Sequence, residues 1–150
     1  MGAMAWCAVF AAVHLFWAAG GTAGPASSAG PELAERRPAG FVVFGLFGVA
    51  ALLLIGIALV MVASGGIGSE RLSRVAAVVL AVVGVALVIR GVALEVLLAT
   101  DAGSLRATVG PLESRCSLAL WNPWFTIGGL LFLWTAIRVR RVRRRVSSSQ

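Results

Sequence analysis

The stretch VAAVVLAVVGVALVIRGVALEVLL, residues 75–98, decides the fold class of this chain. Apart from Arg90 and Glu95 it is apolar on every side, so a helix made from it has no face for water. A helix of about 20 residues crosses an apolar layer of roughly 30 Å at a rise of 1.5 Å per residue. The stretch therefore predicts a membrane-spanning helix and argues against a soluble bundle.

Three other runs have the same character, at residues 3–19, 40–63 and 118–137. The composition agrees with them, since 59% of the residues are apolar, 13% are charged and the mean hydropathy is +0.95. Lipid offers no hydrogen bonds to a bare backbone, so each run must form a helix. We expect an all-α membrane protein: a four-transmembrane-helix bundle forming one integral membrane domain over residues 1–150, with a basic tail at 138–150.

The first run admits a second interpretation, a cleaved signal peptide. Nothing basic precedes it, and His14 and Trp17 interrupt the apolar core that a signal needs. A retained helix is therefore the prediction, although the stretch GGTAGPASSAG at residues 20–30 keeps cleavage open as the alternative.

The arginines predict the orientation. All 13 basic residues are Arg, and six of them follow the last run: Arg138, Arg140, Arg141, Arg143, Arg144 and Arg145. The positive-inside rule places this tail in the cytoplasm, and with four spans the N-terminus lies there too. The expected location is the bacterial inner membrane. On the outer side Arg36, Arg37, Arg106 and Arg115 are balanced by Glu32, Glu35, Asp101 and Glu113, so the net charge of +7 lies mostly inside.

The basic tail could contact lipid or nucleic acid. Arginines beside a bilayer meet anionic head groups, each worth about 1 kcal/mol near the surface. No aromatic residue interleaves these arginines to stack a base. We therefore expect anchoring on anionic lipid head groups and no nucleic-acid partner.

Charged and polar residues interrupt the apolar runs at related depths. Arg90 and Glu95 are five residues apart, which turns them about 140° from each other and toward different neighbours. Each needs a partner, because an unpaired charge at mid-membrane costs at least about 2.5 to 3.5 kcal/mol. Counting along the runs places all these groups in the outer half of the membrane, and they form one candidate ligand-binding or polar cluster: His14, Arg90, Glu95, Asn122, Thr126, Trp17, Trp121 and Trp124.

Each member of this cluster also has a plainer interpretation. Tryptophans at that level often anchor a helix at the interface, and Trp6 and Trp134 are expected to form the matching inner belt. Glu95 can reach the head groups, and His14 can bond a neighbouring helix. Arg90 lies roughly 12 Å below the outer edge, too deep for its side chain to reach the head groups easily. It therefore either joins a functional site or makes a structural interhelical bond.

Small residues predict how the helices pack. Ala77, Gly84 and Gly91 recur every seven residues and would let another helix approach closely. Cys7 is expected near the cytoplasmic end of the first run and Cys116 at the outer end of the last, so most of the membrane separates them and a disulfide cannot form. The sequence holds no complete catalytic motif, no metal-ligand cluster and no nucleotide-binding loop, so we assign no catalytic residue, metal or cofactor.

Three segments carry a family resemblance: HLFWAAGG at residues 14–21, IRG at 89–91 and ESRCSLALWNPWFTIGGLLF at 113–132. They resemble the bacterial four-span membrane proteins of the domain of unknown function 3995, a family common in actinobacteria. The His-x-x-Trp-x-x-Gly-Gly run and Pro123 are the most telling features, whereas Asn122 stands where many members have Ser. The resemblance implies a multi-pass fold and a membrane location, and it implies no reaction.

Three functions remain open. The chain is a non-catalytic accessory or structural component that packs against another membrane protein or a second copy; or a small transporter or binder of an anionic or amphipathic ligand that uses Arg90; or a membrane enzyme with His14 or Glu95 as acid or base. For the enzyme, Ser117 is the nearest candidate nucleophile, and no spacing ties it to His14.

Overall fold

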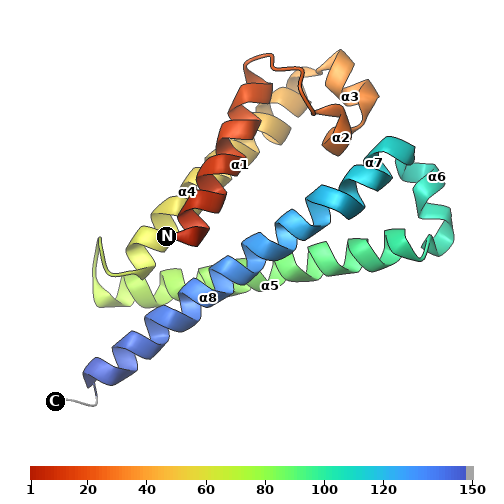
Figure 1. Cartoon of the computed structure of the whole chain (residues 1–150). Helices are drawn as coiled ribbons and strands as arrows, with labels where there is room; N and C mark the ends of the chain where they lie inside the picture. The colour runs from red at the N-terminus through yellow and green to blue at the C-terminus, as the bar shows by residue number, and fades with distance from the viewer. Residues whose placement is uncertain (148–150) are drawn as a thin grey trace.

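The computed structural model describes the backbone of residues 1–147 and the side chains of residues 1–142. Helices and short connections make up this described part, and no strand occurs in it (Figure 1). In chain order the elements are α1 (Gly2–Ala18), α2 (Ala26–Ala29), α3 (Pro31–Arg36), η1 (Phe41–Phe47), α4 (Gly48–Ala63), α5 (Glu70–Ala99), η2 (Ala102–Ser104), α6 (Leu105–Val109), α7 (Pro111–Cys116), η3 (Ser117–Trp121) and α8 (Asn122–Ser147).

Three of the four apolar runs form helices long and apolar enough to cross a membrane. These spans are Phe41–Ala63, Glu70–Ala99 and Pro111–Val142. The first run forms α1, which has 17 residues and is the shortest of the four. The prediction of an all-α fold is confirmed for the described residues, and the length and composition of three helices suit a membrane protein.

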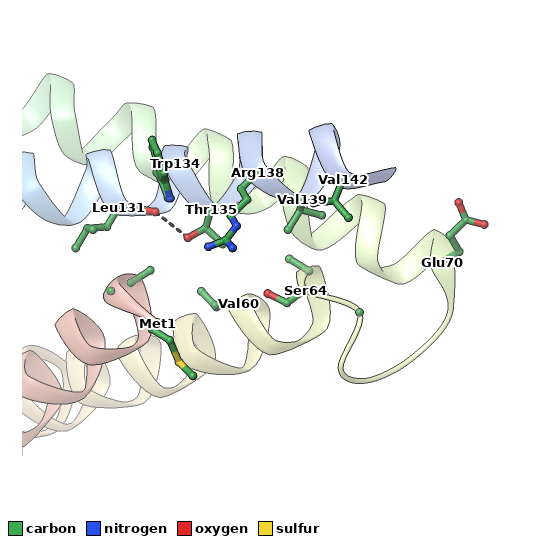
Figure 2. A pocket seen from close by; sticks show the side chains of 14 residues that line it. Met1, Val60, Ser64, Glu70, Leu131, Trp134, Thr135, Arg138, Val139 and Val142 are labelled. Carbon is green, nitrogen blue, oxygen red and sulfur yellow. Dashed lines mark hydrogen bonds between the residues drawn. The ribbon is translucent and has the colours of Figure 1, made fainter. Parts of the chain in front are cut away.

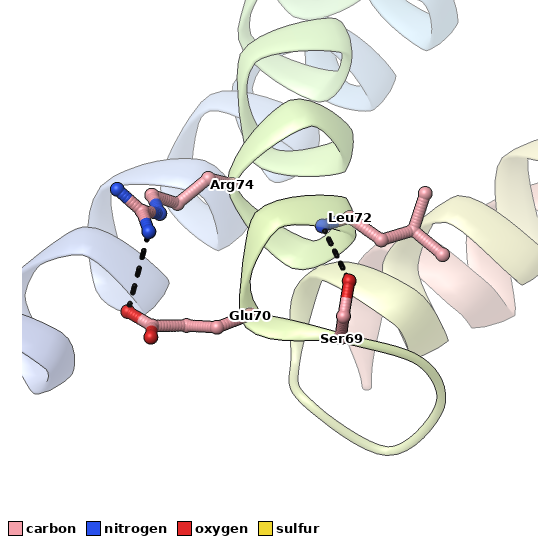
Figure 3. Close-up of polar contacts among 4 residues, drawn as sticks. All are labelled: Ser69, Glu70, Leu72 and Arg74. Carbon is pink, nitrogen blue, oxygen red and sulfur yellow. Dashed lines mark hydrogen bonds and ion pairs between the residues drawn. The ribbon is translucent and has the colours of Figure 1, made fainter.

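Two spans begin earlier than predicted. The Ser69 hydroxyl accepts a hydrogen bond from the backbone N–H of Leu72 at 3.3 Å, and Glu70 pairs with Arg74 at 3.9 Å, so α5 begins on a capped polar turn (Figure 3). The last span begins at Pro111, a residue suited to the first turn of a helix because it needs no N–H acceptor there. Both extensions are polar, which is why hydropathy alone missed them.

The long helices pack as two antiparallel pairs. In Figure 1, α1 lies along α4, and α5 lies along α8 over most of their lengths. Further contacts of α4 with α5 and of α1 with α8 join the pairs. The short helices α2, α3, α6 and α7 gather at one end, which we call the loop end, and the α4–α5 turn lies at the other.

A π-helical turn, η3, precedes α8. The backbone N–H of Asn122 donates to the carbonyl of Ser117, five residues back instead of four. Pro123 has no N–H to offer the carbonyl four residues before it, so the usual helical ladder is broken at this point. The π turn widens the helix locally where Trp121 and Asn122 face α1 and α5.

Aromatic side chains fill the space between α1 and α8. Trp6 stacks on Trp124 with ring centroids 5.7 Å apart and donates its Nε1–H to the Trp124 carbonyl at 3.1 Å. Trp6 is only 5% exposed, so its prediction as an inner-belt residue is wrong. Gly128 makes this possible, because a Cβ there would overlap the Trp6 ring. Trp134, by contrast, is 68% exposed, as an interfacial tryptophan would be.

Glycines bring α5 and α8 into backbone contact. Ala77, Gly84 and Gly91, the predicted small-residue stripe, are all buried. A Cβ on Gly84 would lie 2.8 Å from the Gly129 carbonyl oxygen, and one on Gly129 would lie 2.6 Å from the Gly84 carbonyl oxygen. Side chains at these positions would hold the two backbones apart, so the close contact requires glycine on both helices.

Two loop arginines cap helix ends. Arg37 donates to the Trp17 carbonyl at 2.5 Å, at the end of α1. Arg106 donates through Nε to the Leu98 carbonyl at 2.7 Å, at the end of α5. These carbonyls lie at the negative end of each helix dipole, and each also accepts a backbone N–H from the following turn, of Gly20 and of Asp101. The positive charge of these two arginines is therefore offset partly by carbonyl oxygens. Arg36, by contrast, forms an ion pair with Glu32 at 3.0 Å.

The cysteines are both free thiols. Cys7 is fully buried in the core between α1 and its neighbours, and Cys116 is half-buried at the end of α7. The prediction that they do not pair is confirmed.

Candidate functional site: a polar cavity near the loop end

A small cavity of about 180 Å³ lies where α1, α5 and the start of α8 meet. Its charged and polar walls come from α1, α2, α5 and η3, and aromatic rings close the rest. The lining residues are Phe10, His14, Trp17, Ser28, Arg90, Ser117, Trp121 and Phe125. The fold thus brings His14, Arg90, Trp17 and Trp121 of the predicted cluster to one space.

Arg90 enters this cavity across an aromatic ring. Its guanidinium carbon lies 3.7 Å from the centroid of the Phe125 ring, within the range of a cation–π contact. No carboxylate pairs with it among the ion pairs of the described side chains. A ring face offsets only part of the cost of a guanidinium in an apolar layer, so Arg90 keeps hydrogen-bond donors available to the cavity.

Glu95 turns to a different neighbour. Its carboxylate accepts a hydrogen bond from the Asn122 side-chain amide at 3.2 Å. Asn122 is 1% exposed and Glu95 is half-buried, so this bond is partly buried between α5 and α8. Arg90 and Glu95 therefore have separate contacts, and α8 supplies both of them through Phe125 and Asn122.

Thr126 belongs to the helix contact and does not line the cavity. Its hydroxyl donates to the Asn122 carbonyl at 2.9 Å, within its own helix. A Cβ on Gly91 would overlap the Thr126 hydroxyl, so Thr126 faces the glycine stripe of α5. Glu95, Asn122 and Thr126 together form what we call the α5–α8 seam.

His14 lies edge-on to Phe10, with ring centroids 4.6 Å apart. Its Nδ1 is 2.9 Å from the Phe10 carbonyl oxygen, and because a carbonyl only accepts, Nδ1 must carry the proton. The neutral ring then has its lone pair on Nε2. Ser117 lines the same cavity, although no hydrogen bond joins it to His14 among those of the described residues.

The tryptophans tie loops to helices. Trp17 donates through Nε1 to the Ala23 carbonyl at 2.8 Å, and Trp121 donates to the Ser27 carbonyl at 2.9 Å. The second bond crosses from η3 to α2 and closes the cavity on the loop side. Trp124 sits deeper: its Nε1 is buried without a hydrogen-bond partner, and its ring stacks on Trp6.

Sequence reasoning missed two kinds of residue. Phe125 looks like one more apolar residue in the sequence, but in the fold its ring lies against the Arg90 guanidinium as a cation–π partner. Ser28 lines the cavity from α2, and Arg37, which follows α3, bonds the end of α1; nothing in their spacing ties them to α1 or α8. Only the folded loop brings them close.

The predicted head-group arginines lie at the opposite end of the molecule. Arg138, Arg140 and Arg141 are exposed on the last turns of α8. The side chains of Arg143, Arg144 and Arg145 lie outside the described residues. In the described part of the chain, no three His, Cys, Asp or Glu side chains gather as a metal site would need.

Comparison with known proteins gives one match. The family model described as "Protein of unknown function (DUF3995)" matches residues 7–132. This range includes every residue of the cavity and of the seam. No curated protein and no solved structure matches the chain.

Proposed function

We propose that this chain, which belongs to the DUF3995 family, is a non-catalytic accessory or structural component of the bacterial inner membrane. It crosses the membrane four times with both termini in the cytoplasm, and the cavity opens in the outer half. The arginine-rich end of α8 supports this orientation by the positive-inside rule. At 17 residues α1 spans about 25 Å, which a tilted or slightly thinned bilayer accommodates.

The observation that carries the structural role is that the polar groups near the loop end bond inside the protein. Trp121 holds α2, Arg37 holds the end of α1, and Asn122 holds Glu95 across the seam. Such bonds fix helix and loop positions and leave no free acid–base pair in the seam. A rigid small module with apolar outer faces suits packing against another membrane protein or a second copy.

Extraction from its own membrane in a mild detergent, followed by native mass spectrometry, tests this role. We expect the chain in a complex of fixed stoichiometry with another membrane protein or with itself. The complex should survive His14→Ala, because that side chain lines the cavity and is only 8% exposed. A chain that is always alone, and that shows turnover or solute flux after reconstitution, would refute the accessory role.

A second function is favoured by the cavity itself. We infer that it receives a small anionic group, as a binder or small transporter would, with Arg90 as the charge partner. Its volume of about 180 Å³ suits a small carboxylate or inorganic anion better than a drug-sized molecule. The two serine hydroxyls, Ser28 and Ser117, add hydrogen-bonding groups beside the guanidinium.

Titration with acetate and with inorganic phosphate tests this inference, because Trp17 and Trp121 line the cavity and report binding through fluorescence. We expect a saturable change in fluorescence. Arg90→Leu should weaken the affinity for the anion about tenfold or more, because it removes a charge-assisted contact. Arg71→Leu is the control: Arg71 lies in the first turn of α5, far along the helix from Arg90. This variant removes the same charge and should leave the binding curve unchanged. Identical curves for the parent and the Arg90 variant would rule out anion binding at this cavity.

A further inference from the structure

A second hollow lies at the other end of the molecule, away from the polar cavity. It is an open groove of about 970 Å³ between the start of α1, the end of α4 and the last turns of α8 (Figure 2). Sites that enclose a small molecule measure roughly 300 to 1,000 Å³, so the groove is far larger than an ion needs. We call it the inner groove.

The walls of the inner groove are mostly apolar. Val60 of α4 faces Leu131, Val139 and Val142 of α8 across it. Thr135 adds little polarity, because its hydroxyl donates to the Leu131 carbonyl of its own helix at 2.8 Å. An apolar channel of this kind accepts hydrocarbon more readily than a polar solute.

One arginine side chain projects into this groove. In Figure 2 the Arg138 side chain extends from α8 into the groove beside Thr135. The acidic residue that also lines the groove, Glu70, lies at its far rim and is paired with Arg74 at 3.9 Å (Figures 2 and 3). The part of the groove around Arg138 therefore has a positive potential and apolar walls.

The depth of Arg138 matches the head-group level. Trp134 is one helical turn earlier and 68% exposed, which is typical of a side chain at the membrane interface. Arg138 follows toward the C-terminus, and the walls at Leu131 and Val60 lie toward the apolar layer. A lipid lying along the groove would place its charged head group at Arg138 and its apolar tail at Leu131 and Val60.

We propose that the inner groove binds one anionic phospholipid of the bilayer. The lipid phosphate bonds the Arg138 guanidinium, which matches phosphate with several N–H donors in a fixed geometry. An acyl chain lies between Val60 and Leu131, where the two helix pairs leave apolar surface uncovered. This site differs from general attraction of the arginine tail to the membrane, because it depends on one arginine and on the shape of the groove.

Native mass spectrometry of the full chain, released from bilayers of equal phosphatidylglycerol and phosphatidylcholine, tests the site. We expect one phosphatidylglycerol to be retained in preference to phosphatidylcholine. Arg138→Gln should lower the retention of phosphatidylglycerol at least fivefold. An arginine at an anionic surface contributes roughly 1 kcal/mol, and this variant also loses the direct contact with the phosphate. Arg140→Gln is the matched control, since it removes the same charge two residues away and does not line the groove.

A second variant tests the groove without changing charge. Val139→Phe adds volume to the half-buried wall and should also lower retention, while tryptophan fluorescence confirms that the variants are folded. Equal losses for Arg138→Gln and Arg140→Gln would show only diffuse attraction by the tail and overturn the proposal. Equal retention of the two lipids, or a lipid-free dimer that covers the groove, would overturn it as well.

Discussion

Replacing Gly129 with valine is expected to separate α5 from α8 and to lower the free energy of unfolding by about 3 kcal/mol. Even a Cβ at this position would lie 2.6 Å from the Gly84 carbonyl oxygen and 2.8 Å from the Val88 backbone nitrogen. Both are backbone atoms of a helix, which cannot move aside as a side chain does. Overpacking a tight contact costs roughly 1 to 3 kcal/mol, and a branched side chain against backbone belongs at the upper end.

Gly40→Val is the control for this substitution. Gly40 has helical backbone angles, and apart from its own stretch of chain no atom lies within 4 Å of where a Cβ would be, so the change there should cost less than about 1 kcal/mol. Equilibrium unfolding in mixed micelles, followed by tryptophan fluorescence, measures both variants. If the Gly129 variant is as stable as the Gly40 variant, the close α5–α8 contact does not contribute to stability as we infer.

Asn122→Leu should be the next most damaging change, at about 2 kcal/mol. The substitution removes the amide that donates to Glu95 at 3.2 Å, and it leaves that carboxylate between two helices without this donor. A buried acceptor deprived of its partner costs roughly 1 to 3 kcal/mol, and the half-buried Glu95 carboxylate falls within this range. The same unfolding measurement reports the loss.

A double-mutant cycle separates this bond from a general packing effect. Adding Glu95→Gln to Asn122→Leu removes the charge that was left unpaired, so the double variant should recover part of the stability. Coupling energies between side chains of membrane helices average about 0.6 kcal/mol and reach about 1.7. A coupling of zero would mean that Asn122 contributes through its volume alone.

The class of the fold was readable from hydropathy. Runs such as residues 75–98 have no polar face, and a backbone surrounded by lipid can satisfy its hydrogen bonds only as a helix. The ends of the helices were less readable. Ser69 and Pro111 begin helices on polar or irregular turns, which capping residues mark but hydropathy does not.

The aromatic core shows why side-chain environment was harder to predict. Trp6 lies near the end of its run, where tryptophan most often faces the membrane interface. In the fold it turns inward, because Gly128 on α8 leaves room for its ring and the Trp124 carbonyl accepts its N–H. Neither partner can be identified from positions along α1.

The sequence indicated which residues belong to the candidate site, but it did not indicate which of them contact each other. Depth along a helix follows from counting residues, so the sequence by itself determined that Arg90, His14 and Trp121 lie at related levels of helices that cross an apolar layer. Rotation about the helix axis depends on which faces pack, and only the tertiary structure decided that. Through the glycine contact at Gly84 and the π turn at η3, it placed Glu95 on Asn122 and Arg90 over Phe125, with a cavity between the second pair and α1. The reason is physical: hydrophobic burial sets how deep a residue lies, whereas side-chain shape and local backbone irregularity set which neighbour it meets.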